Sequence, residues 1–147
     1  MVLSKSFAYA LRGILYVSLM QEEKRKVSLD EIAGQLKVPR YFLAKIMKDV
    51  VKAGVLSATR GQQGGFFINN NTLNTSLTTI IRLTDGEEYF NICMLSLQKC
   101  NSSNPCPLHS KFEPGRRELF EVCHNTTIGM VIKNNKPEFI KSISLIK

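Results

Sequence analysis

The chain has 147 residues and a formal net charge of +8, with 44% hydrophobic and 22% charged residues. This composition is typical of a globular domain with one real core, and it argues against intrinsic disorder except in the last few residues. The excess of cations favours an anionic partner, either nucleic acid or an acidic membrane surface. No stretch approaches the roughly 18 apolar residues that span a bilayer, and no secretory leader is recognisable, so we expect a cytoplasmic protein.

The first predicted helix spans residues 4–20 and is apolar on most sides. Such a helix is usually buried all round, by the core and by a partner subunit. After a polar loop, the residues Ser28-Leu29-Asp30-Glu31 form a capping box, in which Ser28 caps the amide of Glu31 and the glutamate returns to the N–H of Ser28. This motif predicts a short second helix that ends near Leu36.

A third helix is predicted to begin at Pro39, because proline fits the first turn, where its missing N–H would be unpaired anyway. The helix runs to about Ala53, and Gly54 terminates it. One apolar stripe at helical spacing is formed by Leu43, Ile46, Met47 and Val50. The cations of this helix lie largely away from that stripe, at Arg40, Lys45, Lys48 and Lys52.

The pattern changes after Gly54. Residues 55–57 and 66–68 are short strand candidates, and the glycine-rich tip between them carries Arg60. Two short helices, a basic helix and a hairpin predict a mainly α fold with a small β-hairpin wing, that is, a winged helix-turn-helix domain.

The second half of the chain is less regular. A short helix over residues 78–83 is expected to end near Gly86, and residues 87–108 are expected to form an irregular loop. A further helix is predicted from Arg116 to about His124, started or kinked by Pro114-Gly115. Residues 126–147 are expected to add one more short helix.

A helix-turn-helix places its second helix in the major groove of DNA. Arg40 and Tyr41 lie at the N-terminal end of that helix, where base edges come within reach, and Arg60 on the hairpin tip suits insertion into a minor groove. The predicted DNA-binding residues are Ser28, Pro39, Arg40, Tyr41, Lys45, Lys48, Arg60, Gly64 and Gly65. The alternative is that these cations only solvate a surface. A membrane partner is not expected, because a membrane-surface helix would carry aromatic or leucine anchors opposite its cations, whereas here that face belongs to the core.

Three of the four cysteines fall in one short stretch, in the pattern C-x6-C-x5-C-x2-H formed by Cys93, Cys100, Cys106 and His109. Soft thiolates and an imidazole suit iron or zinc, and iron–sulfur clusters are usually held by four such ligands. Zinc fits three cysteines and a histidine equally well. From spacing alone, an iron–sulfur cluster, a zinc ion and reactive thiols remain open, whereas Cys123 is expected to be a small buried hydrophobe.

Four segments together resemble the IscR/NsrR/CymR family of bacterial winged-helix regulators: Tyr9-Ala10-Leu11, Val27-Ser28-Leu29-Asp30-Glu31-Ile32-Ala33, Lys52-Ala53-Gly54-Val55-Leu56 and Arg60-Gly61-Gln62-Gln63-Gly64-Gly65-Phe66. The resemblance runs to about Val131. It implies a homodimer, built largely through a C-terminal dimerisation helix, that binds a pseudo-palindromic double-stranded operator and usually represses transcription. We therefore expect a DNA-binding domain over residues 1–86, a cluster-binding loop over 87–110, and a dimerisation helix with a tail over 111–147.

The resemblance also bears on the cysteines. Cluster-bearing members have three cysteines at this place, and regulators of the IscR type place a histidine three residues after the last one, as in Cys106-Pro107-Leu108-His109. The histidine slightly favours a [2Fe–2S] cluster over a [4Fe–4S] cluster, although the first gap is one residue longer than usual. Where some nitric oxide sensors have a ligating aspartate this chain has Ala8, and where some members have a base-reading glutamate it has Ala44.

These observations predict a DNA-binding regulator rather than an enzyme, since the sequence shows no nucleophile–base pairing, phosphate loop or paired carboxylates. The expected function is repression with an operator affinity modulated by an iron–sulfur cluster that senses redox state, nitric oxide or iron–sulfur status. The alternative is a cluster-free regulator of the same fold, controlled by cysteine thiol chemistry, zinc or a protein partner.

Overall fold

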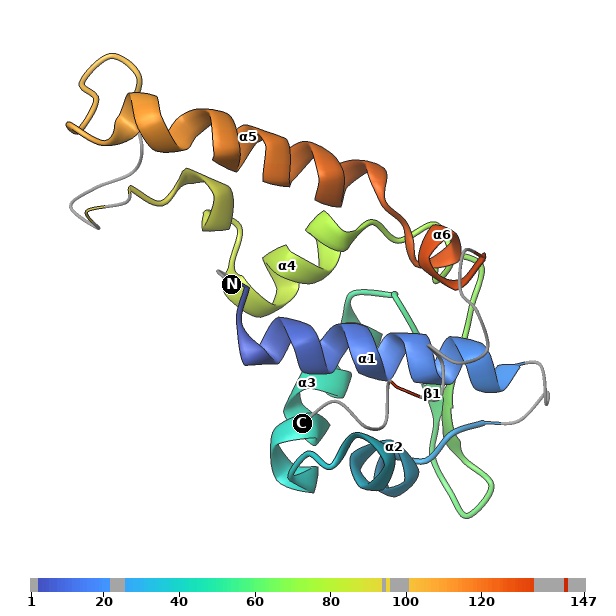
Figure 1. Cartoon of the computed structure of the whole chain (residues 1–147). Helices are drawn as coiled ribbons and strands as arrows, with labels where there is room; N and C mark the ends of the chain where they lie inside the picture. The colour runs from blue at the N-terminus through green and yellow to red at the C-terminus, as the bar shows by residue number, and fades with distance from the viewer. Residues whose placement is uncertain (1–2, 22–25, 94, 96–100, 134–141, 143–147) are drawn as a thin grey trace.

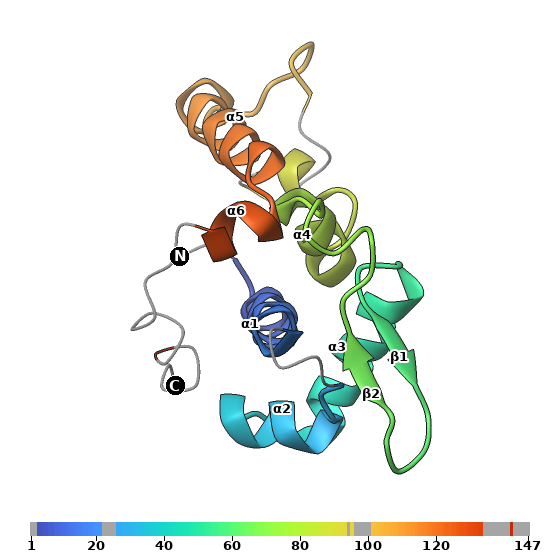
Figure 2. The same ribbon diagram turned by 90° about the vertical axis from the view of Figure 1, so that its right-hand side faces the viewer.

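The computed structural model describes residues 3–21, 26–93, 95, 101–133 and 142. The described elements are α1 (Lys5–Met20), α2 (Leu29–Leu36), α3 (Arg40–Lys52), β1 (Ser57–Thr59), β2 (Gly65–Phe67), α4 (Leu77–Asp85), the 3-10 helix η2 (Tyr89–Asn91), α5 (His109–Asn125) and α6 (Ile128–Lys133). Figures 1 and 2 show α1 in the middle, α5 on one side of it, and α2, α3 and the hairpin on the other. The mainly helical fold with a two-stranded hairpin confirms the predicted fold class.

Helix α1 is the central element because it contacts α2, α3, α4 and α6. Its first turn is capped by Ser4, whose hydroxyl oxygen accepts a hydrogen bond from the N–H of Phe7 at 3.0 Å. Ala10 and Ile14 are completely buried, and Val17 is 1% exposed. The predicted helix over residues 4–20, apolar on most sides, is thus confirmed as the core helix.

Helices α2 and α3 form the helix-turn-helix. The Ser28 hydroxyl accepts a hydrogen bond from the N–H of Glu31 at 3.1 Å, as the capping motif predicts. The carboxylate of Glu31 also accepts a hydrogen bond from the Tyr16 hydroxyl at 3.3 Å, which ties α2 to α1. Helix α3 begins one residue later than predicted, with Pro39 as its N-cap, and Gly54 follows its end with a φ of 79°, as expected of a terminating glycine.

The hairpin pairs Ser57 with Phe67 and Thr59 with Gly65 in antiparallel register. The first predicted strand is wrong by two residues, since Val55 and Leu56 are 2% and 1% exposed and lie in the core before β1 begins. Their apolar character reflects burial against the helices and not strand pairing. The second strand is confirmed to within one residue.

The base of the hairpin is joined to the segment that precedes α2. The N–H of Val27 donates to the carbonyl of Phe66 at 2.9 Å, and the N–H of Phe66 donates to the carbonyl of Val27 at 2.7 Å. Gly65 sits in this contact with a φ of 151°, and a Cβ there would lie 2.7 Å from the Val27 carbonyl oxygen. The close approach of the two backbones therefore requires glycine at position 65.

The second half of the chain folds back over α1 through α4. Helix α4 is capped by Ser76 and ends at Asp85, with Gly86 as its C-cap, close to the predicted bounds. The region after it contains η2, which the sequence did not predict. Helix α5 begins at His109, seven residues before the predicted Arg116, and contains Pro114 in its interior. A proline removes one N–H from the helical ladder, and here it neither starts nor ends the helix.

Helix α6 is the further short helix expected after residue 126. The predicted tail beyond it lies outside the described residues, apart from Ser142. Among the helices of the described ranges, none is long and apolar enough to cross a membrane.

Candidate nucleic-acid interface and cysteine-rich segment

Helix α3 has one buried face and one exposed face. Leu43 and Met47 are completely buried, which fixes the rotation of the helix against α1 and α2. On the opposite side Tyr41 is 80% exposed, and Lys45 and Lys48 are exposed as well. The predicted DNA-contacting residues of this helix therefore share a solvent-facing surface, with an aromatic ring at its N-terminal end.

An ion pair links this surface to α2. The Nε of Arg40 lies 2.5 Å from the Oδ1 of Asp30, and both side chains are largely exposed. An exposed pair contributes little to stability, about 0–1 kcal/mol, so its main effect is to orient Arg40. Pro39 makes no side-chain cap bond, which leaves the positive end of the α3 dipole without a carboxylate or hydroxyl cap.

Phe42, the residue after Tyr41, packs against α1. Its ring packs edge-on against Tyr9 of α1, with centroids 5.8 Å apart, and the Arg12 guanidinium lies 5.1 Å from the centre of the Tyr9 ring. This contact connects the first turn of α3 to α1. Phe42 was not among the predicted site residues. Its position next to Tyr41 in the sequence is the one signal that could have pointed to it.

The hairpin tip presents Arg60, which is exposed. The tip turns tightly at two glycines. Gly61 has a φ of 105°, and at Gly64 the backbones approach so closely that an added Cβ would lie 2.3 Å from the carbonyl oxygen of Thr59. Gly64 and Gly65 thus shape the hairpin through backbone contacts. Of the other predicted residues, Ser28 caps α2 at the start of the motif.

The cysteine-rich segment is described at its two ends. Cys93, which follows η2, is 3% exposed. Cys106 is half-buried, and its carbonyl oxygen accepts a hydrogen bond from the N–H of His109 at 3.0 Å, in the turn that starts α5. Cys100, the middle cysteine of the predicted ligand set, lies outside the described residues.

The chemistry of these donors fits an iron–sulfur cluster or a zinc ion, because three soft thiolates and one imidazole stand in a single segment. Within the described ranges, no three His, Cys, Asp or Glu side chains are placed to share one metal ion. Cys93, Cys106 and Cys123 form no disulfide with one another. The described members of the predicted ligand set, Cys93, Cys106 and His109, are therefore not brought together around one metal position.

Both ends of this segment are held by elements that contact each other. The Phe90 ring of η2 packs edge-on against Phe120 of α5 with centroids 5.1 Å apart, and Phe120 stacks on His124 at 5.3 Å. Cys123 is 3% exposed in the same contact region, in agreement with its predicted role as a small buried hydrophobe. Burial raises the pKa of the Cys123 thiol above its usual value, so the thiol stays protonated at neutral pH.

Helix α5 leaves most of its surface uncovered. Of its seventeen residues, all of them described, Cys123 alone is buried. Phe112 and Val122 are 40% and 57% exposed, and Met130 of the neighbouring α6 is 48% exposed. Exposed apolar side chains of this size thus occur along both α5 and α6.

Comparison with known proteins adds a family. A family model named Rrf2 and described as an iron-dependent transcriptional regulator matches residues 3–134. An HTH-type transcriptional regulator of Aquifex aeolicus is 33% identical over 130 residues, which are 87% of this chain and 89% of that protein. The regulator IscR of Vibrio vulnificus is 23% identical over 92% of this chain and 80% of its own length.

Solved structures agree on the fold. CymR, described as the global cysteine regulator of B. subtilis, superposes with a TM-score of 0.72 at 18% identity, over 91% of this chain and 98% of that one. IscR of T. potens gives a TM-score of 0.70 at 22% identity, over 92% and 89%. The family model and the Aquifex relative each cover most of the sequence, so the chain belongs to the Rrf2 family of transcriptional regulators, which are not enzymes.

Proposed function

We propose that this chain is a sequence-specific repressor that binds double-stranded DNA as a homodimer, and that an iron–sulfur cluster modulates its operator affinity. The outward face of α3 carries the DNA-binding part of the proposal. That face presents Tyr41, Lys45 and Lys48 to solvent while its opposite face is buried, which is the arrangement that lets a helix enter the major groove. Arg60 on the hairpin tip would then reach an adjacent minor groove.

The homodimer is supported by α5. Its exposed apolar residues, Phe112 and Val122, would be covered by the same helix of a second copy around a two-fold axis. Such a dimer presents two α3 helices, and a two-fold operator with half-sites about one helical turn apart would match them.

The cluster is assigned to Cys93, Cys100, Cys106 and His109. When bound, it would supply a redox-active group that responds to oxidants, to nitric oxide or to iron–sulfur supply, and [2Fe–2S] is slightly favoured over [4Fe–4S]. The protein would transmit the change through its own elements. The segment from Cys93 to Cys106 joins η2 to α5, α5 contacts α4, and α4 contacts both α1 and α3. A rearrangement of the segment would thus bias the spacing of the two α3 helices.

A second candidate is a cluster-free regulator controlled by thiol chemistry, by zinc or by a protein partner. The fold likeness to CymR, named as a cysteine regulator, favours thiol chemistry in particular. The half-buried Cys106 is the described cysteine most accessible to such chemistry.

Iron, acid-labile sulfide and zinc content, together with the visible spectrum, distinguish these candidates in protein purified without oxygen. We expect iron and sulfide in equal amounts, about two or about four per chain depending on cluster type. Serine at Cys93, Cys100 or Cys106 should abolish the signal, whereas Cys123→Ser, the matched control in the core, should retain it. Zinc alone, or no metal after reconstitution with iron and sulfide, would refute the cluster.

DNA binding is tested separately, with a duplex selected from random sequence by the protein itself. The logarithm of affinity should fall linearly with the logarithm of salt concentration, by about 0.9 per neutralised phosphate. The double variant Lys48→Ala/Arg60→Ala should weaken binding and make the slope shallower by up to about 1.8. Lys111→Ala on α5, away from α3 and the hairpin, is the control. A double variant that binds as the wild type does would contradict the assignment of these two residues.

A further inference from the structure

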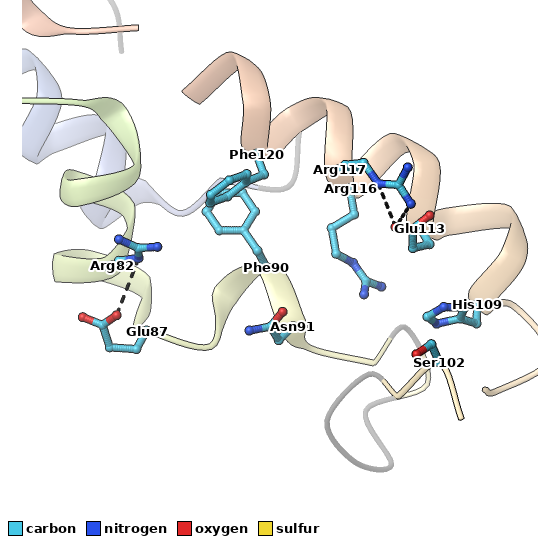
Figure 3. Close-up of a pocket in the computed structure, with 10 residues that line it drawn as sticks. All are labelled: Arg82, Glu87, Phe90, Asn91, Ser102, His109, Glu113, Arg116, Arg117 and Phe120. Carbon is cyan, nitrogen blue, oxygen red and sulfur yellow. Dashed lines mark hydrogen bonds and ion pairs between the residues drawn. The ribbon is translucent and has the colours of Figure 1, made fainter. Parts of the chain in front are cut away.

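A cavity of about 500 Å³ lies where α4, η2 and α5 meet. Its volume is within the range of about 300–1,000 Å³ that small-molecule sites occupy. Figure 3 shows side chains from all three elements converging on it. In both overall views α5, which supplies half of the residues that line the cavity, lies on the other side of α1 from α2 (Figures 1 and 2).

The charged side chains that line the cavity are three arginines and two glutamates. The Nε of Arg82 lies 3.5 Å from the carboxylate of Glu87. Arg117 forms an ion pair and two hydrogen bonds with Glu113, one turn away on α5. Both carboxylates thus already have an arginine partner, and the third arginine, Arg116, has no carboxylate partner among the described residues.

Arg116 is half-buried, and its guanidinium points into the cavity between Asn91 and His109 (Figure 3). A guanidinium offers a planar pair of N–H donors that matches a carboxylate or phosphate in two parallel hydrogen bonds. Partial burial strengthens that interaction, because the surrounding dielectric constant is lower than that of water.

Around Arg116 the cavity offers neutral polar groups and an aromatic wall. The Asn91 amide and the Ser102 hydroxyl line one side, and the Asn91 amide also donates to Glu88 at 3.4 Å. Phe90 and Phe120, in edge-on contact with each other, form the apolar part of the lining. A cation with no carboxylate partner in the described part of the chain, beside polar groups and two rings, would suit a molecule that carries both an anionic and an apolar part.

We propose that this cavity binds a small organic anion, whose carboxylate or phosphate pairs with Arg116 and whose apolar part contacts Phe90 and Phe120. The inference goes beyond the proposed function and requires neither DNA nor a cluster. A ligand in this position bridges η2 and α5 and touches Ser102 of the cysteine-rich segment. A small metabolite bound in the cavity would thus contact the region where α5 meets the DNA-binding half of the chain.

The test is calorimetric and NMR titration of the full chain in low-chloride buffer with benzoate and phenyl phosphate, with benzamide as the neutral control. We expect saturable binding of at least one anion, no binding of benzamide, and a shift of an arginine Nε–H resonance. Arg116→Gln should weaken binding about tenfold or more, because the fork of donors is lost. Lys111→Gln, an exposed cation on the same helix outside the cavity, should leave binding unchanged.

Asn91→Asp is a second variant, in which a carboxylate placed beside Arg116 competes with the probe and should weaken binding in the same way. Failure of both anions to bind the wild-type chain at millimolar concentration would overturn the proposal. Equal binding by the wild-type, Arg116→Gln and Asn91→Asp chains would overturn it as well. Because the titration contains no DNA, its failure is distinguishable from a failure of repression, and the metal content of each sample identifies any effect of a cluster.

Discussion

Replacement of Gly65 by alanine tests how the wing is anchored to the rest of the domain. Gly65 has a φ of 151°, and an added Cβ would lie 2.7 Å from the carbonyl oxygen and 3.0 Å from the nitrogen of Val27. Both are backbone atoms, so no side-chain rotation relieves the contact. Strand β2 must therefore move away from Val27, and the hydrogen bonds between Val27 and Phe66, at 2.9 and 2.7 Å, are stretched or lost.

The cost has two parts. A residue held in this backbone region loses about 1–3 kcal/mol, and each lost hydrogen bond removes about 1 kcal/mol. We expect Gly65→Ala to lower the free energy of unfolding by about 3 kcal/mol. For a two-state protein of this size, about 2–4 °C is lost per kcal/mol, so Tm should fall by about 6–12 °C while the chain remains folded.

The matched control is Gly61→Ala at the hairpin tip. Gly61 also has a positive φ, 105°, but an added Cβ there meets no heavy atom within 4 Å. This variant should show backbone strain alone, about 1–2 kcal/mol. Urea denaturation followed by circular dichroism measures both variants. If Gly65→Ala costs no more than Gly61→Ala, the close contact with Val27 does not anchor the wing, and the reasoning is refuted.

Three further predictions concern the helix cap, the exposed face of α3 and the buried thiol. Ser28→Ala should cost about 1 kcal/mol in urea denaturation because the cap of α2 is lost, whereas the exposed Ser110→Ala should stay within about 0.5 kcal/mol. Tyr41→Ala should leave Tm unchanged but weaken DNA binding in an anisotropy assay, because its side chain is exposed. Phe42→Ala should lower Tm, because its ring packs against Tyr9. Equal losses of Tm in the two variants would contradict the assignment of Tyr41 to the DNA-binding face. The pKa of Cys123 is raised in the folded state, so the free energy of unfolding should fall as pH rises above the usual thiol value near 9. Urea denaturation from pH 8 to 10.5 should show a smaller fall in Cys123→Ala than in the wild type. Identical pH profiles for the two proteins would refute this prediction.

Local patterns in the sequence predicted the first half of the fold well. The Ser28 cap, the apolar stripe of α3 and the terminating Gly54 depend on residues within one or two turns of each other, so spacing alone carries the information. The sequence predicted less well those boundaries that long-range packing determines. Val55 and Leu56 have the apolar, branched character of a strand, yet the core needs them before the strand starts.

The start of α5 was predicted wrongly for a related reason. Residues 109–115 show little apolar periodicity, so Pro114 was interpreted as a boundary, although it lies inside the helix. The Asp30–Arg40 pair and the cavity around Arg116 were not predicted at all. Each joins residues from different elements, and the tertiary fold alone brings them together. The spacing of the cysteines likewise gives donor types but not their convergence.

The near absence of buried residues in α5 has a consequence for local unfolding. An amide in α1 exchanges only when the core opens, whereas α5 has one buried side chain, Cys123, and packs on one side against α4 and η2. Hydrogen exchange should thus be slow in α1 and much faster in α5 when the protein is dilute. If a second copy covers α5, its protection should rise with protein concentration while that of α1 does not. The helix would then report self-association directly, residue by residue, without any DNA or metal present.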